Sequence, residues 1–171
     1  DRKVSISGAA FYYDYRNKQL RAKFVGPIFG ALDKLVNVPK STIKGAEIEI
    51  TARPVQGLTL SAAATYLDAK VKSYNGAVGS QVDPITGSRV AVVESFKGVR
   101  LPFSPKLQYN FRADYGFPVS DDLQAFVGVG VNGQTKSTGV LTTFGVDPSL
   151  FRINARTLVN LNAGFGAADD A

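Results

Sequence analysis

Four residue types are absent from this sequence of 171 residues: cysteine, methionine, tryptophan and histidine. Without cysteine there is no disulfide framework and no thiolate chemistry, and cysteine usage gives no information on the redox compartment. Without histidine the chain lacks the commonest metal ligand and the commonest general base, which argues against a zinc site or a hydrolase triad. We therefore expect no metal, no cofactor and no enzyme activity.

Long apolar runs are also missing, because no stretch approaches the roughly 20 residues of a transmembrane helix. The sequence opens at Asp1 without a signal peptide and passes almost at once into a strand pattern. We interpret it as a piece of a longer protein. The net charge of +6 would suit nucleic acid, anionic lipid or an anionic ligand, and it would equally suit an ordinary solvated surface.

The sequence does contain a regular alternation of apolar and polar side chains, which is clearest in residues 105–116. Successive side chains of a strand face opposite sides of a sheet, so a period of two predicts a strand with one apolar and one wet face. The wet face carries both charge signs and amides along its whole length. A strand of about 10 residues, tilted by roughly 45°, crosses a bilayer's hydrocarbon core. The pattern leaves open whether the apolar face meets a protein core or lipid.

Five further segments alternate in the same way and are predicted as strands: 4–24, 42–53, 58–72, 123–136 and 153–165. The connections alternate between long and short along the chain: 25–40, 54–57, 73–104, 117–122 and 137–152. Most of these strands are about twice as long as the typical 5–6 residues of a strand. Turn residues at 83–87 predict a small hairpin inside the second long connection. Val4 and Ile6 occupy even positions and Phe11 an odd one, so the apolar residues change sides within the first strand. This change suggests a bulge near the start of that strand.

Long strands joined alternately by short turns and long loops are typical of outer-membrane barrels, which have an apolar exterior and a polar interior. The sequence therefore predicts an all-β fold, an antiparallel transmembrane β-barrel segment of about six long strands. Aromatic residues near strand ends would form the interfacial girdles: Tyr13, Tyr15, Tyr66, Tyr115, Phe117 and Phe165. The strands of a soluble β-sandwich also alternate apolar and polar residues, so a sandwich that acts as a binding module is the alternative prediction.

The alternation assigns side chains to the two faces of this wall. The candidates for the lipid-facing side are Leu60, Tyr66, Leu107, Tyr109, Phe111, Val127, Val129, Val159 and Leu161. The candidates for the lumen-facing side are Lys44, Glu47, Glu49, Lys106, Gln108, Asn110, Arg112, Asp114, Asn160 and Asn162. We expect Lys44 to share the face of Glu47 and Glu49.

Several segments of the chain resemble, in order, the C-terminal half of the barrel of TonB-dependent outer-membrane receptors. The matching segments are AAFYYDYRNKQL, IKGAEIEITARPVQGLTLSAAATYLDAKV, FKGVRLPFSPKLQYNFRADY and ARTLVNLNAGFGAADD. The most specific motifs are Lys44-Gly45-x-Glu47-x-Glu49, Pro54-x-x-Gly57-Leu58, Tyr66-x-Asp68-Ala69 and Gly98-Val99-Arg100-Leu101-Pro102-x-x-Pro105. The order and spacing of these motifs carry the resemblance, because each motif alone is weak.

The resemblance implies a barrel of about 22 strands in the outer membrane of a Gram-negative bacterium. Such a barrel closes around an N-terminal plug and imports a scarce nutrient, such as a ferric siderophore, a vitamin or a saccharide, with energy delivered by TonB. Residues 1–171 would then be part of the barrel domain, with the plug and the last strands outside them. This piece alone should not transport anything. A passive porin is a further alternative, since it would have neither plug nor TonB contact.

Two motifs could be taken for enzyme chemistry. Residues 128–133 satisfy the G-x-G-x-x-G dinucleotide fingerprint, but they lie inside an alternating strand with no helix after them. We expect the glycines to leave room on the lumen side. Glu47 and Glu49 could form an acid and base pair as in glycosidases. Nothing else in the chain supports catalysis, and we favour a polar network that faces the plug.

Basic residues are frequent in or beside the long connections. The candidates for contact with a ligand are Lys34, Arg89, Lys97 and Arg100. If these connections are extracellular, the charges would meet lipopolysaccharide phosphates or a small anionic nutrient. Basic and aromatic residues together can also bind single-stranded nucleic acid. Here the aromatic side chains are predicted on the apolar strand face rather than the basic one, so we expect no nucleic-acid partner.

Overall fold

The computed structural model describes residues 3–26, 30–141 and 151–167. Nearly all of them lie in strands, all of which pair antiparallel: β1 Val4–Gly26, β2 Gly30–Ala52, β3 Leu58–Ser73, β4 Asn75–Val82, β5 Arg89–Ser95, β6 Leu107–Ser120, β7 Leu123–Gln134, β8 Ser137–Thr138, β9 Arg152–Ile153 and β10 Arg156–Ala167. In this described part of the chain, no helix is long and apolar enough to cross a membrane.

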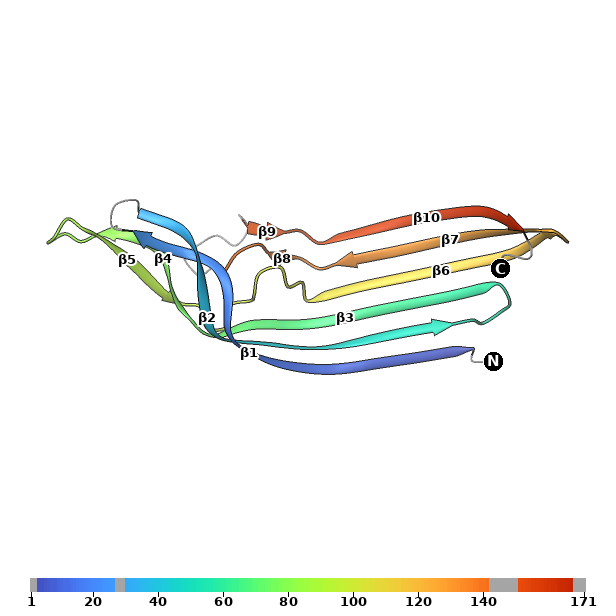
Figure 1. Ribbon diagram of the computed structural model, residues 1–171, viewed down its shortest axis with the longest axis horizontal. Helices are drawn as coiled ribbons and strands as arrows, with labels where there is room; N and C mark the ends of the chain where they lie inside the picture. The colour runs from blue at the N-terminus through green and yellow to red at the C-terminus, as the bar shows by residue number, and fades with distance from the viewer. Residues whose placement is uncertain (1–2, 27–29, 142–150, 168–171) are drawn as a thin grey trace.

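The six long strands belong to one eight-stranded sheet of order β10-β7-β6-β3-β2-β1-β4-β5. Each long strand therefore lies beside its sequence neighbours among the long strands, and the short strands β4 and β5 continue the sheet beyond β1. The long strands run side by side along the longest axis of the molecule (Figure 1). This arrangement confirms the predicted all-β fold of six long antiparallel strands. The sheet is open in the described residues, as expected for part of a larger barrel.

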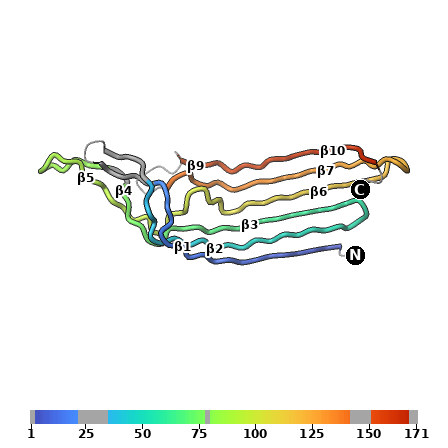
Figure 2. The backbone as a smooth tube through the Cα atoms, in the orientation of Figure 1, coloured from blue at the N-terminus to red at the C-terminus, as the bar shows by residue number. Residues whose placement is uncertain are grey.

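The short turns gather at one end of the sheet and the long connections at the other (Figure 2). The β2–β3 turn shows why a short connection suffices: Gly57 has φ of +79°, which L residues rarely adopt. A Cβ at Gly57 would also collide with the carbonyl oxygen of Gly116 on the neighbouring hairpin. The second short turn is tighter than predicted, because β6 continues to Ser120 and only two residues separate it from β7.

The prediction of a long loop over residues 25–40 is wrong, because β1 and β2 stay paired as far as Gly26 and Gly30. Pro39 suggested a loop because proline has no N–H to donate to a ladder. The pairing passes over Pro39 and the facing Asn17, whose φ is +53°, and continues beyond them. Lys34 consequently lies in β2. Near this point the hairpin bends away from the sheet (Figure 1).

The bulge expected near the start of β1 is also absent, because the register to β2 is unbroken from Val4–Ala52 to Arg16–Lys40. The irregularity lies instead between β2 and β3, at Lys40/Ser41. An unbroken register fixes which side chains share a face. The unbroken pairing therefore determines on which side of the sheet each side chain of β1 lies from Val4 to Arg16.

The hairpin predicted inside residues 73–104 is confirmed as β4–β5. Its turn depends on Asp83, whose carboxylate accepts hydrogen bonds from the backbone N–H groups of Ile85 at 2.8 Å and Thr86 at 3.1 Å. These bonds hold the pKa of the Asp83 carboxyl below its usual range.

The segment after β5 lies against β3 rather than free in solution. The backbone N–H of Val71 donates to Val99 at 2.9 Å, and that of Leu101 donates to Ala69 at 3.0 Å. Around these bonds lies a small buried cluster made of Val38, Ala69, Val71, Phe96 and Leu101. The cluster fixes the end of this long connection to the strand wall.

Candidate functional site

Directly paired residues of antiparallel strands point to the same side, so the register sorts the wall into two faces. We call one of them the apolar face. It carries Val4, Ile6, Tyr12, Ile48, Ile50, Leu60, Tyr66, Leu107, Tyr109, Phe111, Tyr115, Val127, Val129, Val159, Leu161 and Phe165. All nine residues predicted to face lipid are among them. The register thus places these nine on one side, and it leaves open what that side contacts.

The opposite side, which we call the polar face, carries eight of the ten predicted lumen residues. They are Glu47, Glu49, Gln108, Asn110, Arg112, Asp114, Asn160 and Asn162. Lys106 precedes β6, and its carbonyl oxygen accepts a bond from the N–H of Leu67 at 2.8 Å.

The expectation that Lys44 shares a face with Glu47 and Glu49 is wrong. Lys44 pairs with Tyr12 and with Asp68, which places it on the apolar face, two residues from Ala46. The reason is positional: Lys44 and Glu47 are three residues apart, and an odd spacing reverses the side of a strand. Its ammonium lies 3.9 Å from the Asp68 carboxylate.

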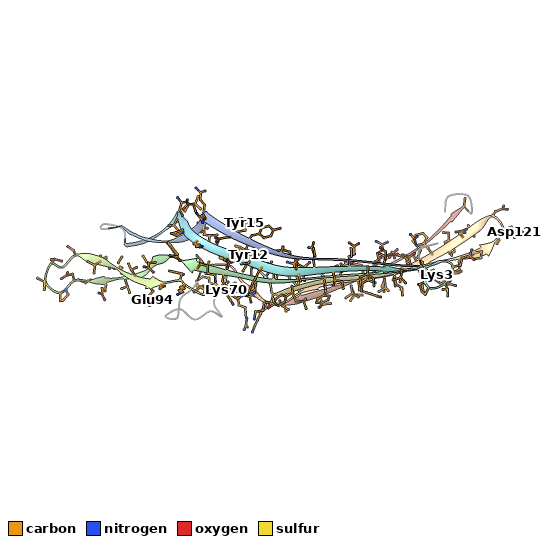
Figure 3. All side chains as sticks on the ribbon, turned by 90° about the horizontal axis from the view of Figure 1, so that it is seen from below. Lys3, Tyr12, Tyr15, Lys70, Glu94 and Asp121 are labelled. Atoms are coloured by element: carbon orange, nitrogen blue, oxygen red, sulfur yellow. The ribbon has the colours of Figure 1, made fainter. Side chains whose placement is uncertain are left out.

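A line of aromatic rings runs along β1 on the polar face. Phe11, Tyr13 and Tyr15 pair with Gly45, Ile43 and Ser41 of β2, in the same alternation as Glu47. The ring centroids of Phe11 and Tyr13 are 5.3 Å apart, and those of Tyr13 and Tyr15 are 5.9 Å apart. The Lys18 ammonium lies 5.4 Å from the Tyr15 centroid, within cation–π range. Figure 3 labels Tyr15 near the bend of β1.

The sequence indicated that Phe11, Tyr13 and Tyr15 share a face, but not that this is the polar face, and the girdle assignment of Tyr13 and Tyr15 is wrong. They stand on the polar side, whereas Tyr12 stands on the apolar side. The sequence already contained this information, because every second residue of a strand lies on the same face. Continuing from Val4 and Ile6 in steps of two leads to Tyr12 and not to Tyr13.

Ionic and amide groups fill the middle of the polar face. Arg112 donates to both carboxylate oxygens of Asp114, at 2.6 Å and 3.0 Å. A Cβ on Gly128 would come within 2.6 Å of the Asp114 carboxylate and within 2.5 Å of the Asn162 amide oxygen. Gly128 therefore makes room for these polar groups, as expected. The same expectation is wrong for Gly133, which pairs with Tyr109 on the apolar face, where a Cβ would lie 2.5 Å from the tyrosine ring.

Two shallow hollows open on this polar face. One, of about 330 Å³, is lined by Ser7, Glu47, Glu49 and Thr65 among others. The second, of about 290 Å³, lies against Gln108, Asn110, Gln134 and Arg156. Both have polar walls open to one side, which suits contact with a polar partner better than enclosure of a substrate. Among the described residues, no group of three acidic side chains is placed to hold a metal ion.

Three of the basic residues predicted for ligand contact lie in the connection between β3 and β6, whereas Lys34 lies in β2. Arg89 opens β5 and donates to the Ser80 hydroxyl at 3.3 Å, and Lys97 follows β5. Arg100 pairs with Lys70 of β3 and donates to the Ser104 carbonyl at 3.0 Å. None of these contacts joins one of the three residues to another.

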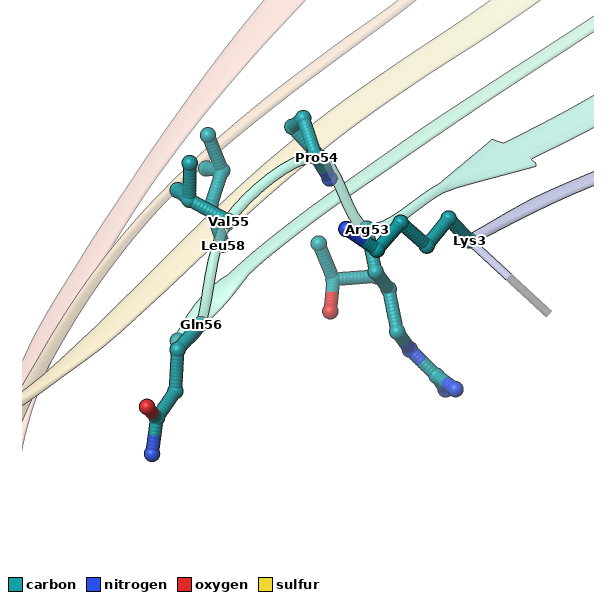
Figure 4. Close-up of a pocket in the computed structure, with 8 residues that line it drawn as sticks. Lys3, Arg53, Pro54, Val55, Gln56 and Leu58 are labelled. Carbon is teal, nitrogen blue, oxygen red and sulfur yellow. The ribbon is translucent and has the colours of Figure 1, made fainter. Parts of the chain in front are cut away.

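A third hollow, of about 480 Å³, lies at the opposite end, beside the β2–β3 turn (Figure 4). It is lined by Lys3, Arg53 and the turn residues. The backbone N–H of Arg53 donates to the Lys3 carbonyl at 2.7 Å, which ties the start of β1 to this turn.

The barrel-domain profile described as "TonB dependent receptor-like, beta-barrel" matches residues 1–170, nearly the whole chain. The chain belongs to the TonB-dependent receptor family. No solved structure gives a significant match. The family confirms the resemblance seen in the sequence, and with it the barrel fold, the outer-membrane location and the absence of enzyme activity.

Receptors of this family transport ligands across the Gram-negative outer membrane and work with a plug domain and with TonB. The family decides against the soluble β-sandwich and against the passive porin. For a TonB-dependent receptor, the described sheet is a stretch of barrel wall. Its two faces are then the surfaces through which it can act.

Proposed function

We propose that this chain forms part of the wall of an outer-membrane transporter that imports a scarce nutrient, of the siderophore, vitamin or saccharide class, with energy supplied through TonB. The observation that carries the proposal is the division of six long strands into one apolar and one polar face. In β6 the apolar side chains run from Leu107 to Phe117. That is about 33 Å along the strand at ~3.3 Å per residue, or roughly 23 Å of depth at a 45° tilt. An outer-membrane barrel needs an apolar band of about 25 Å.

In this proposal the apolar face contacts lipid and the polar face contacts the plug and the water of the lumen. Unpaired polar groups in hydrocarbon are costly, so the Arg112–Asp114 pair and the amides beside it belong inside. The aromatic line on β1 would then stand in the lumen too. There it offers ring faces to a plug side chain or to a passing ligand.

The end of the sheet with the long connections would face the exterior, and the short turns the periplasm. Lys34, Arg89, Lys97 and Arg100 would then lie around the entrance. Their positive charge suits a small anionic nutrient, and at the membrane surface it also suits the phosphates of lipopolysaccharide. Residues 1–171 would supply part of the barrel domain of the complete receptor.

The proposal is tested by uptake into cells that carry the full-length receptor. Radiolabelled ferric siderophores, cobalamin and maltodextrins are offered in turn, in strains with and without TonB. We expect one class to accumulate only when both the receptor and TonB are present. Accumulation that persists without TonB would show passive diffusion and contradict the proposal.

A further inference from the structure

Two cations stand side by side at the short-turn end of the polar face, where β1 begins and β2 ends. The backbone N–H of Arg53 donates to the carbonyl oxygen of Lys3 at 2.7 Å, which continues the β1–β2 register by one pair beyond Val4–Ala52. The Val4–Ala52 pair lies on the apolar face, and successive pairs of a ladder alternate between the two sides. Lys3 and Arg53 therefore both belong to the polar face, and we call them the basic pair.

No carboxylate neutralises the basic pair in the part of the chain that the structure describes. On the polar face of β2, Glu49 lies four residues from Arg53, or about 13 Å along the strand. Asp114 lies on the same face two strands away, but its two oxygens accept bonds from Arg112. Like charges directly opposite each other destabilise an antiparallel pair. An anion bound between Lys3 and Arg53 would remove this repulsion.

The basic pair lines the hollow of about 480 Å³ beside the β2–β3 turn (Figure 4). The rest of the lining comes from residues 54–59, which include the Gln56 amide and the Thr59 hydroxyl but no acidic side chain. In Figure 4 the side chains of Arg53 and Gln56 extend to one side of the turn and that of Val55 to the other. The hollow thus combines a charge of +2 with polar hydrogen-bonding groups, which suits an oxyanion of more than one negative charge.

The basic pair also has a counterpart at the other end of the polar face. Arg156 pairs with Gln134 on this face, at the end with the long connections, where β10 begins. Further along the face Glu49 is acidic and Arg112 is neutralised by Asp114. An anion that passes along the polar face from the long connections to the short turns would therefore meet the basic pair last.

We propose that this hollow is an exit site, which binds a carboxylate or phosphate group of the imported nutrient at the periplasmic end of the lumen. The inference rests on the import proposed above, and it narrows the nutrient to one with at least two negative charges. Ammonium and guanidinium groups are strong donors to the oxygens of such groups, and a guanidinium can donate two parallel bonds. Both cations are exposed, so water and salt screen the attraction and the anion can leave.

The first test measures anion binding and needs no transport. It uses the full-length receptor, purified in detergent and folded as judged by heat-modifiable migration, with a fluorophore on Gln56→Cys at the hollow. Pyrophosphate and tricarballylate are titrated separately at a constant ionic strength set with sodium chloride. The variant Lys3→Gln/Arg53→Gln removes both cations. The matched control Lys72→Gln/Lys136→Gln removes the same charge from two exposed positions at the opposite end of the sheet.

We expect the wild type and the control to bind the anions with the same affinity, and the variant to bind at least about tenfold more weakly, because its charge-assisted hydrogen bonds are lost. The tighter of the two anions identifies the group that the site takes, carboxylate or phosphate. Should the double variant fail to fold, Arg53→Gln alone should weaken binding about threefold, and added salt should weaken binding to the wild type. A wild type that does not respond to either anion, or a folded variant that binds like the wild type, would overturn the proposal.

The second test links the site to import, with the radiolabelled nutrient that accumulates in the uptake experiment above. We expect Lys3→Gln/Arg53→Gln to lower the rate of TonB-dependent uptake severalfold, while the affinity of the nutrient for the cell surface stays at the wild-type value. An unchanged uptake rate in the folded variant, or a nutrient without negative charge, would also overturn the exit site. Uptake that needs no TonB would contradict the import itself, and the anion titration separates that failure from a failure of the exit site.

Discussion

Phe111 and Asn110 are neighbours in β6 that stand on opposite faces, and this makes them a matched pair for one substitution. Phe111 pairs with Ala62 and Val131 on the apolar face, and it is 41% exposed. Asn110 pairs with Ala63 and Asn132 on the polar face. Because the two positions differ in depth by only about 3.3 Å along the strand, an arginine at either samples the same level of the membrane.

Phe111→Arg should destabilise the assembled barrel far more than Asn110→Arg. Position 111 lies four residues from Leu107 and six from Phe117, near the middle of the apolar stretch of β6. An arginine on the lipid side near the bilayer midplane costs about 2–4 kcal/mol. That range corresponds to a change of roughly 30- to 700-fold in the folding equilibrium. On the polar face arginine remains hydrated, and Arg112 shows that the face accepts this side chain.

The assay is a urea titration of the full-length receptor in lipid vesicles, followed by heat-modifiable migration and by fluorescence. We expect the midpoint to fall clearly for Phe111→Arg and to stay near wild type for Asn110→Arg. Equal losses for the two variants would refute the assignment of faces. A larger loss for Asn110→Arg would reverse it.

Three further predictions concern single positions. Gly57→Ala should cost at least about 1–2 kcal/mol of barrel stability, because the alanine is strained at positive φ and its Cβ meets Gly116. Gly87→Ala, where nothing lies within 4 Å, should cost less, and equal urea midpoints would count against the clash. A tryptophan reporter at Tyr12→Trp should be quenched by brominated lipid more strongly than one at Tyr13→Trp, and the opposite order would exchange their faces. The Asp83 carboxyl, whose pKa is lowered by backbone N–H bonds, should titrate by NMR below its ordinary value. The β4–β5 turn is then stabilised at neutral pH and loses this contribution as the solution is acidified through the lowered pKa, whereas a raised pKa would contradict the hydrogen-bonded turn.

The strands and their order could be predicted because alternation is a local property of the sequence. In β6 the period of two runs from Leu107 to Tyr115 without interruption, and its partners in β3 and β7 follow the same period. Hairpin partners are also sequence neighbours, so the order of the sheet followed from the short turns and the long connections.

The errors arose where a partner strand overrides local preference. Pro39 suggested a loop, but β1 supplies a paired neighbour on both sides of it. Lys44 was grouped with Glu47 by chemical type, whereas the register groups it with Tyr12 and Asp68. The pairing of Arg100 with Lys70 could not be predicted from the sequence, because it depends on a connection that folds back onto β3.

The central claim is that the face carrying Phe111 contacts lipid and the face carrying Asn110 lines the lumen. It is tested most directly by single nitroxide labels placed at each position from 107 to 115 of the full-length receptor in vesicles. The chain contains no cysteine of its own, so each introduced cysteine in β6 is unique within it. We predict that accessibility to oxygen peaks at the odd positions and accessibility to a water-soluble nickel complex at the even ones. An accessibility profile without a period of two, or with the two reagents exchanged, would contradict the account.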